Sequence, residues 1–245
     1  MSAILAVAES VWRRILRMKV LYFLIACAVA LIAITCMYKY LMAFEQRLLM
    51  VDVSLLLTSL SGLLCVLSLA FDIPRELNEG SAAALLSKPL GRTQYLIGKF
   101  LGISVVAVVV TGLITVGFVV VHYLAYKTVP ADALKGHLLA VASVVPMAAI
   151  ALLFASLLGE AGAAVLTFLV VFLLSSMDSI PRVAALKIVY GGIIPALELF
   201  NFRAEAAHDI GIPWGYVGLA AVWGIVYSIG MVAFAGLLFN RRDLK

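Results

Sequence analysis

The glycine-containing stretch Gly91–Phe100 is the part of the sequence that comes closest to a nucleotide-phosphate site. The phosphate-binding loop of ATPases requires G-x-x-x-x-G-K-[ST], because its Ser or Thr ligates the magnesium ion. Here six residues rather than four separate Gly91 from Gly98, and Phe100 stands where the hydroxyl is needed. The sequence therefore predicts no ATPase site and no cofactor bound by this chain itself.

The cysteines and histidines are too scattered to indicate a metal or redox centre. The cysteines all fall in apolar runs without a C-x-x-C pair, and the histidines stand at the ends of such runs or outside them. We therefore predict no disulfide and no metal site, and structural or solvent-facing histidines. There is also no H-E-x-x-H motif to indicate a metalloprotease. These residues are Cys27, Cys36, Cys65, His122, His137 and His208.

Apolar residues dominate the composition. Of the 245 residues, 65% are hydrophobic and 13% are charged, whereas a soluble domain has about 45–50% and about 25%. A helix that spans a bilayer needs roughly 20 consecutive apolar residues, so the apolar runs predict an all-α membrane protein and exclude a soluble domain. The six predicted transmembrane helices are Val20–Tyr38, Val53–Phe71, Phe100–Tyr123, Leu138–Leu158, Ala163–Met177 and Trp214–Phe239.

Charged residues are distributed unevenly around these predicted spans. Their interiors contain no Asp, Glu, Lys or Arg, although ion-coupled carriers and proton pumps usually require such groups within the membrane. Basic residues are more numerous in the N-terminus, the segment Asp72–Lys99 and the C-terminus than in the other loops. The positive-inside rule therefore predicts both termini and this segment in the cytoplasm. The net charge of +5 is explained by topology, without a nucleic-acid partner.

Residues 1–19 are predicted to form an amphipathic helix that lies along the membrane interface. Trp12 is expected in the headgroup layer, with Arg13, Arg14 and Arg17 directed toward anionic lipid. Two interpretations stay open: the helix carries motion into the first span, or it is a passive anchor.

The segment Asp72–Lys99 contains closely spaced helix breakers. Gly80 can end one helical turn, and Ser81 can cap a short helix over Ala82–Ser87 that Pro89 cannot continue. These helix-breaking and capping residues predict a short helix across the membrane surface. An ordinary polar connection is the alternative. Its acidic side chains are Glu76 and Glu79, and its basic side chains are Lys88 and Arg92.

The second long connection, Asp178–Pro213, precedes the last predicted span. Lys187 and several Gly and Pro residues argue against a seventh span, so short interfacial or re-entrant helices near the outer face are expected. These helices could cover an exit path or simply pack on the bundle. The candidate exterior-gate residues are Pro195, Glu198, Phe200 and Asn201.

Residues 76–99 resemble the region between the second and third spans of type-2 ABC exporter permeases. In that family an acidic residue precedes glycine, and a run of leucine, a small residue, proline and arginine enters the third span. The sequence has Glu79-Gly80, then Leu86-Ser87-Lys88-Pro89 and Arg92. The motif Pro195…Glu198-Leu199-Phe200-Asn201 and the basic tail Asn240–Leu244 are also similar to the family, as are six spans after an amphipathic helix. The chain looks closest to small bacterial permeases, including those associated with multicopper enzyme maturation.

The resemblance implies an exporter permease of the bacterial cytoplasmic (inner) membrane, driven by a separate cytoplasmic subunit that binds ATP and magnesium. Family members combine two six-span subunits, so a second copy or a homologue is expected beside it in the lipid. The alternatives are a membrane scaffold or assembly factor that uses the same ATPase, and an intramembrane enzyme or passive channel. The helix Ala82–Ser87 would be the coupling helix. The implied coupling residues are Glu76, Glu79, Gly80, Ser81, Leu85, Lys88, Pro89 and Arg92.

Overall fold

The computed structural model describes residues 3–15, 17–36, 46–78, 91–175, 197–208 and 210–240, and within these ranges the chain is almost entirely helical and has no strand. The all-α fold is thereby confirmed. The helices are α1 (Ala3–Ile15), α2 (Lys19–Thr35), α3 (Gln46–Ala70), α4 (Asp72–Asn78), α6 (Arg92–Tyr126), α7 (Ala131–Leu157), α8 (Glu160–Ser175), the 3-10 helix η3 (Leu197–Phe200), α10 (Arg203–Ala207) and α11 (Trp214–Asn240).

Helices occur at all six predicted positions, but they differ in length. Four are long and apolar enough to cross a membrane: α3 together with α4, then α6, α7 and α11. The pair α1 and α2 qualifies only jointly, with a 65° bend between them. The 17 residues of α2 and 16 of α8 extend about 26 and 24 Å, against a hydrocarbon core of roughly 30 Å. A count of six spans therefore stays a prediction.

Four predicted boundaries differ from the structure by seven or eight residues. Two of them are the starts of α3 and α7, which lie at Gln46 rather than Val53 and at Ala131 rather than Leu138. The second span continues past Phe71 as α4, because Arg75 N–H still bonds the Phe71 carbonyl oxygen at 3.4 Å. The third helix begins at Arg92, eight residues before the predicted Phe100, because Gln94 caps the backbone N–H of Gly91 at 3.2 Å. The stretch 72–99 is therefore helical at both ends rather than a loop.

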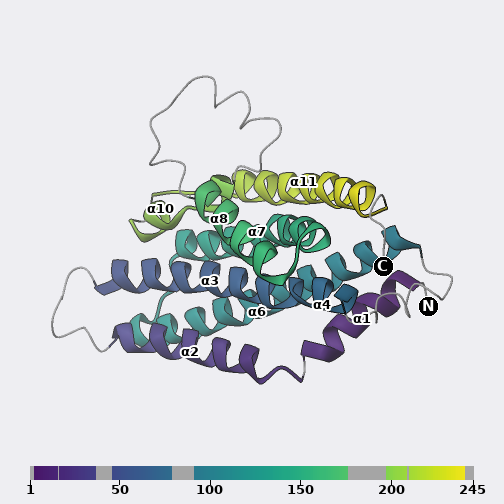
Figure 1. Cartoon of the computed structure of the whole chain (residues 1–245). Helices are drawn as coiled ribbons and strands as arrows, with labels where there is room; N and C mark the ends of the chain where they lie inside the picture. The colour runs from purple at the N-terminus through teal and green to yellow at the C-terminus, as the bar shows by residue number, and fades with distance from the viewer. Residues whose placement is uncertain are drawn as a thin grey trace.

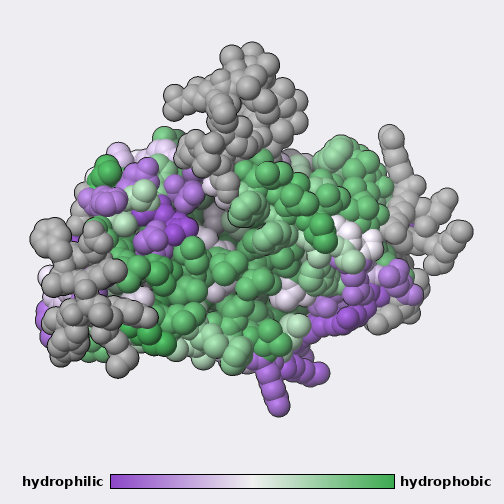
Figure 2. All heavy atoms as spheres, turned by 60° about the vertical axis from the view of Figure 1, so that its left-hand side comes forward, coloured by the Kyte–Doolittle hydropathy of each residue, from purple (hydrophilic) through white to green (hydrophobic). Residues whose placement is uncertain are grey.

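The predicted break after the fourth span is present. Leu158 has extended backbone (ψ 166°), α8 begins at Glu160, and α8 packs against α7. Among the four long helices α7 is the most buried and α11 the least. Figure 2 shows hydrophobic side chains over the middle of one face, between two separate hydrophilic patches. This distribution is that of a protein surrounded by lipid at its middle.

The N-terminal helix and the end of α11 lie at the same end of the bundle (Figure 1). There, Asn240 Nδ2 donates to Thr93 Oγ1 at 3.3 Å, and Arg92 Nη1 donates to the Asn240 carbonyl oxygen at 3.4 Å. The segment 79–90 leaves the described structure at this same end, between α4 and α6. Which side of the membrane this end faces stays a prediction.

Several predicted site residues lie outside the described residues, in 79–90 and 176–196, and the basic tail lies outside them from residue 241 onward. They include the predicted coupling helix Ala82–Ser87. The site residues concerned are Glu79, Gly80, Ser81, Leu85, Lys88, Pro89 and Pro195.

Candidate functional site

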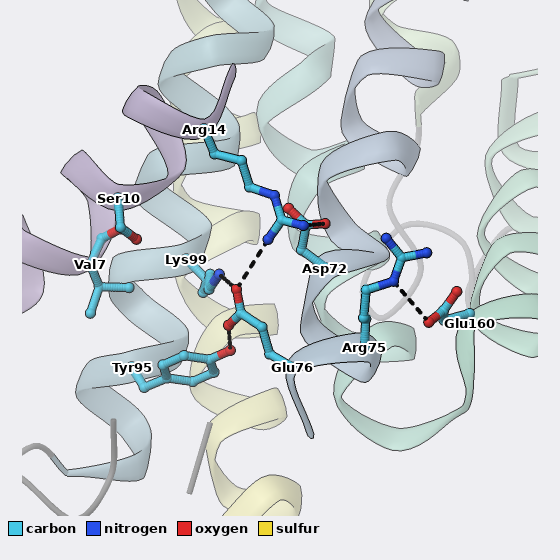
Figure 3. A network of polar contacts seen from close by, with 9 residues as sticks. All are labelled: Val7, Ser10, Arg14, Asp72, Arg75, Glu76, Tyr95, Lys99 and Glu160. Atoms are coloured by element: carbon cyan, nitrogen blue, oxygen red, sulfur yellow. Dashed lines mark hydrogen bonds and ion pairs between the residues drawn. The ribbon is translucent and has the colours of Figure 1, made fainter. Parts of the chain in front are cut away.

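The short helix α4 places two carboxylates, Asp72 and Glu76, one turn apart beside the start of α6. Glu76 Oε1 accepts a hydrogen bond from Lys99 Nζ at 2.6 Å, and Glu76 Oε2 accepts one from the Tyr95 hydroxyl at 2.6 Å (Figure 3). Tyr95 and Lys99 are themselves one turn apart on α6. A single carboxylate therefore ties α4 to two successive turns of α6.

A third helix, α1, joins this cluster through Arg14. Its Nη2 lies 3.0 Å from Asp72 Oδ1 and its Nη1 lies 3.6 Å from Glu76 Oε1 (Figure 3). We call the five side chains that connect α1, α4 and α6 the Glu76 network. They are Arg14, Asp72, Glu76, Tyr95 and Lys99.

The Glu76 network balances two positive charges against two negative ones. Lys99 is only 4% exposed, and a buried ammonium is tolerated only when it is paired. Removing one member leaves the other charge buried and uncompensated, which costs about 3–5 kcal/mol in measured cases. The members are therefore mutually dependent, and the three helices are held in one relative arrangement.

Gly98 and Gly102 form a G-x-x-x-G pair on α6, a motif that permits close helix packing, and here it lets α1 approach α6 closely. A Cβ atom at Gly98 would lie 2.6 Å from Val7 Cβ, and one at Gly102 would lie 2.7 Å from Val11 Cβ. Both distances are shorter than any real carbon contact, so only glycine fits while α1 stays in place. The sequence indicates close packing at this motif, and the structure identifies α1 as the partner.

Substituting Gly102 by valine is expected to displace α1 and to lower the melting temperature of the purified protein by several degrees. Overpacking of this kind typically costs about 1–3 kcal/mol. The matched control is Gly112→Val on the same helix, because a Cβ there meets nothing within 4 Å. Thermal unfolding in detergent compares the two, and equal melting temperatures would show that the close approach contributes nothing.

A separate ion pair links α4 to the turn between α7 and α8. Arg75 Nε lies 3.5 Å from Glu160 Oε1, and both side chains are about half exposed (Figure 3). An exposed pair of this kind contributes about 0–1 kcal/mol. This ion pair therefore stabilises the packing of α4 less than the Glu76 network does.

The opposite end of the bundle carries a second set of ionic contacts. Arg203 Nη2 lies 2.9 Å from each carboxylate oxygen of Asp52, and its Nε lies 3.1 Å from Oδ1. This bidentate geometry attaches α10 to the first turns of α3. Nearby, Asp132 accepts from Lys135 Nζ at 2.8 Å and from the Ile212 N–H at 3.1 Å, which attaches the segment before α11 to α7.

Three of the candidate exterior-gate residues lie at this end. Phe200 is buried, and a Cβ on Gly224 would be 3.0 Å from its Cζ and 3.6 Å from Pro146 Cδ, so the ring is inserted where α7 and α11 meet. Asn201 Nδ2 donates to the Ser175 carbonyl oxygen at 3.2 Å. Glu198 lies in η3, on the same short segment.

Two histidines are packed inside this end of the bundle. The ring of Phe118 lies between His122 and His137, with centroid distances of 5.5 and 4.2 Å. Both rings bond a backbone carbonyl through Nδ1, at 2.6 Å to Thr128 and 2.8 Å to Ala133. These contacts are those of core residues, and no group of three or more possible metal ligands occurs among the described residues.

The predicted site residues fall into different surroundings. Glu76 points into the bundle rather than outward, and Arg14 binds acidic side chains rather than facing lipid. Arg13 pairs with Glu9 at 2.6 Å, while Trp12 is partly exposed. The sequence interpretation missed Asp72, Tyr95 and Lys99. Their i, i+4 spacing on two helices was the signal that could have found them.

The fold and its polar ends define a multi-pass α-helical membrane protein, with several helices long and apolar enough to span. The sequence model of the ABC-2 family transporter proteins matches residues 5–244. The chain belongs to this family and is an ABC transporter permease subunit, which confirms the resemblance at the level of the family. Membership implies pairing with an ATP-binding subunit. Members of the family are membrane subunits for transport and are generally not catalytic themselves. No curated protein sequence gave a significant match.

Proposed function

We propose that this chain is the membrane-spanning subunit of an ABC exporter, driven by a separate cytoplasmic ATPase that binds the segment 79–90. The Glu76 network is the observation that carries the proposal. Glu76 lies two residues before the end of α4, and Tyr95 lies in the first turn of α6. Both ends of the segment are therefore attached to the network, and a displacement of the segment reaches α1, α4 and α6 together.

The continuous helix formed by α3 and α4 provides a path from this end to the other. Backbone hydrogen bonds run through the junction at Phe71. Asp52 and Glu76 stand 24 residues apart on this rod, which is about 36 Å at 1.5 Å per residue. One end of the rod holds the Glu76 network and the other holds Arg203. Movement of α4 is thus expected to reach the exterior segment without any intermediate element.

We further propose that the exterior segment from η3 to Pro213 is the gate. Phe200 closes the junction of α7 and α11, and the Asp52–Arg203 pair holds the segment down. In this proposal Glu76 and Arg14 are positioning residues, and the docking contacts come from Glu79, Gly80, Ser81, Leu85, Lys88, Pro89 and Arg92. We place both termini in the cytoplasm of a bacterial cell, and a second permease subunit beside this one.

Placing arginine at an acidic and at an apolar position of the docking segment is expected to separate the permease from the ATP-binding subunit. A Glu79→Arg/Leu85→Arg variant should lose both co-purification with the ATP-binding protein and its stimulation of ATP hydrolysis. The control is Lys127→Glu, an exposed position at the opposite end of α6. If the double variant binds and stimulates the ATPase like the parent, the segment 79–90 does not couple the subunits.

A membrane scaffold that uses the same ATPase without carrying a solute is the second candidate. The matched family is named for transport, which favours the permease. Inside-out vesicles that contain both subunits distinguish the two functions. ATP-dependent accumulation of solute supports the exporter, whereas ATP hydrolysis without any accumulation supports the scaffold.

A further inference from the structure

A column of four aromatic rings stands where the end of α6 meets the first turns of α7. Tyr126, His122 and Phe118 follow one another at four-residue intervals on α6, with centroid distances of 4.8 and 5.5 Å. His137 of α7 stacks on Phe118 at 4.2 Å, with an angle of 15° between the rings. Both histidines of this column are fully buried, whereas His208, the third histidine of the chain, is exposed.

His137 is held in its neutral form. Its Nδ1 lies 2.8 Å from the Ala133 carbonyl oxygen, and since a carbonyl can only accept, the ring proton is on Nδ1. Its Nε2 is buried and has no hydrogen-bond partner among the described residues. A second proton on Nε2 would create a buried cation without an acceptor, which is strongly unfavourable away from water. The charged form of His137 therefore requires that water reaches this turn of α7.

The titratable and charged side chains on the elements around His137 are paired with one another or lie beyond an apolar ring. They are His122 and Tyr126 on α6 beyond Phe118, Asp52 on α3 with Arg203 on α10, and Asp132 with Lys135 on α7. On α11 the Tyr216 hydroxyl donates to the Leu199 carbonyl oxygen at 2.9 Å, and on α10 Glu205 is partly exposed. None of these groups bonds the His137 ring, so none compensates a positive charge on it.

The segment from η3 to Pro213 rests on the same two turns of α7. A Cβ atom on Gly136, the neighbour of His137, would lie 3.0 Å from the Ala206 Cβ of α10. One turn earlier, Asp132 accepts from the Ile212 N–H at 3.1 Å. Release of α10 therefore uncovers the turn that holds His137, and hydration of His137 disturbs the turn on which α10 lies.

We propose that His137 is an acid-sensitive lock on the gate: its neutral form stabilises the closed arrangement, and its protonation favours the open one. The inference rests on the gate of the proposed function. An imidazole in water binds its second proton with a pKa of about 6.5. If the second proton binds only when the gate is open, acid favours the open state, whose population relative to the closed state rises about tenfold from pH 7.5 to pH 5.5.

The permease alone in nanodiscs tests the lock, so the result does not depend on the ATPase. The three native cysteines are replaced, and a cysteine at the buried position Leu197 reports opening through its rate of reaction with a membrane-impermeant maleimide. This rate is divided by that of Lys127→Cys, an exposed position at the same end, because the thiolate that reacts with maleimide becomes scarcer in acid. The ratio is expected to rise about tenfold from pH 7.5 to pH 5.5.

Two substitutions that cannot be protonated remove the lock in different ways. His137→Phe keeps a ring that can stack on Phe118, and His137→Asn keeps a donor for the Ala133 carbonyl oxygen. In both variants the ratio should stay constant with pH. His208→Gln and His122→Phe are the controls for the other two histidines, and they should keep the parent response.

Arg203→Glu, which breaks the pair with Asp52, separates failure of the lock from failure of the gate. A pH response that persists in either His137 variant overturns the lock. So does a parent without any pH response in which Arg203→Glu still accelerates labelling. If neither acid nor Arg203→Glu accelerates labelling, the gate itself is refuted and the lock with it.

Discussion

Replacing Lys99 by methionine is expected to destabilise the protein by about 3–5 kcal/mol and to abolish stimulation of the partner ATPase. Lys99 Nζ is the closest cation to Glu76, at 2.6 Å, whereas Arg14 is 3.6 Å away. Without the ammonium, the Glu76 network keeps two carboxylates and one guanidinium in a largely buried place. The uncompensated charge has to be hydrated, and α4 has to move away from α6.

A compensating substitution, Glu76→Gln, tests whether the loss in Lys99→Met comes from the unpaired carboxylate. In the double variant Lys99→Met/Glu76→Gln the network is neutral again, because Arg14 and Asp72 still pair. The glutamine oxygen can accept from the Tyr95 hydroxyl as Glu76 Oε2 does. We therefore expect the double variant to recover most of the lost stability, although not the attachment to Lys99.

Arg75→Met, on α4 beside Glu76, is the matched control for Lys99→Met on α6. Its partner Glu160 is half exposed, so a loss of about 0–1 kcal/mol is expected. Chemical unfolding in detergent and ATP hydrolysis by the reconstituted complex supply the two measurements. A Lys99→Met variant as stable as Arg75→Met, or a double variant no better than the single one, would refute the role assigned to the Glu76 network.

The second large effect is expected at the end of the bundle that the proposed function places outside, where Arg203→Glu should release the segment that contains Phe200. The substitution replaces contacts of 2.9 Å between opposite charges by two carboxylates at the same place. A shift of about 1.4 kcal/mol in the opening equilibrium changes the exposed population about tenfold. A cysteine at the buried position Leu197 in η3 reports this opening through its rate of reaction with a membrane-impermeant maleimide.

The measurement uses a background in which Cys27, Cys36 and Cys65 are replaced. Labelling of Leu197→Cys is expected to accelerate about tenfold in Arg203→Glu and to return to the parent rate in Asp52→Arg/Arg203→Glu. Lys127→Glu makes the same charge change at an exposed position and should leave the rate unchanged. A parent rate in Arg203→Glu, or a fast rate in the charge-swapped pair, would show that the ion pair does not hold the gate.

The two ends of the molecule have different consequences for function. At one end the Glu76 network holds three helices by largely buried charge, and in the proposed function it transmits displacement and resists opening. At the other, the Asp52–Arg203 pair is 43% and 35% exposed, so it contributes less to stability and can break at smaller cost. In the proposed function the strong junction lies near the ATPase and the weaker one at the exit, which suits an alternating opening.

The sequence by itself determined which segments are helical and that lipid surrounds them. In lipid every backbone N–H and C=O group has to be satisfied within the segment, so a long apolar run has almost no alternative to a helix. Local rules likewise predicted the amphipathic α1 and the break near Gly159. The motifs around residues 76–99 were sufficient for the family, because they are contiguous in sequence and do not depend on packing.

Only the tertiary structure decided which helices meet. Periodicity assigns a residue to a face of its own helix, but it contains no information about the helix opposite. The inward direction of Glu76 depends on α6 lying beside α4, and the bonding of Arg14 depends on α1 crossing both. Asp52 and Arg203 are 151 residues apart, and their pairing follows from the packing of α10 on α3. Long-range contacts of this kind arise from the packing of whole helices, which no local pattern encodes.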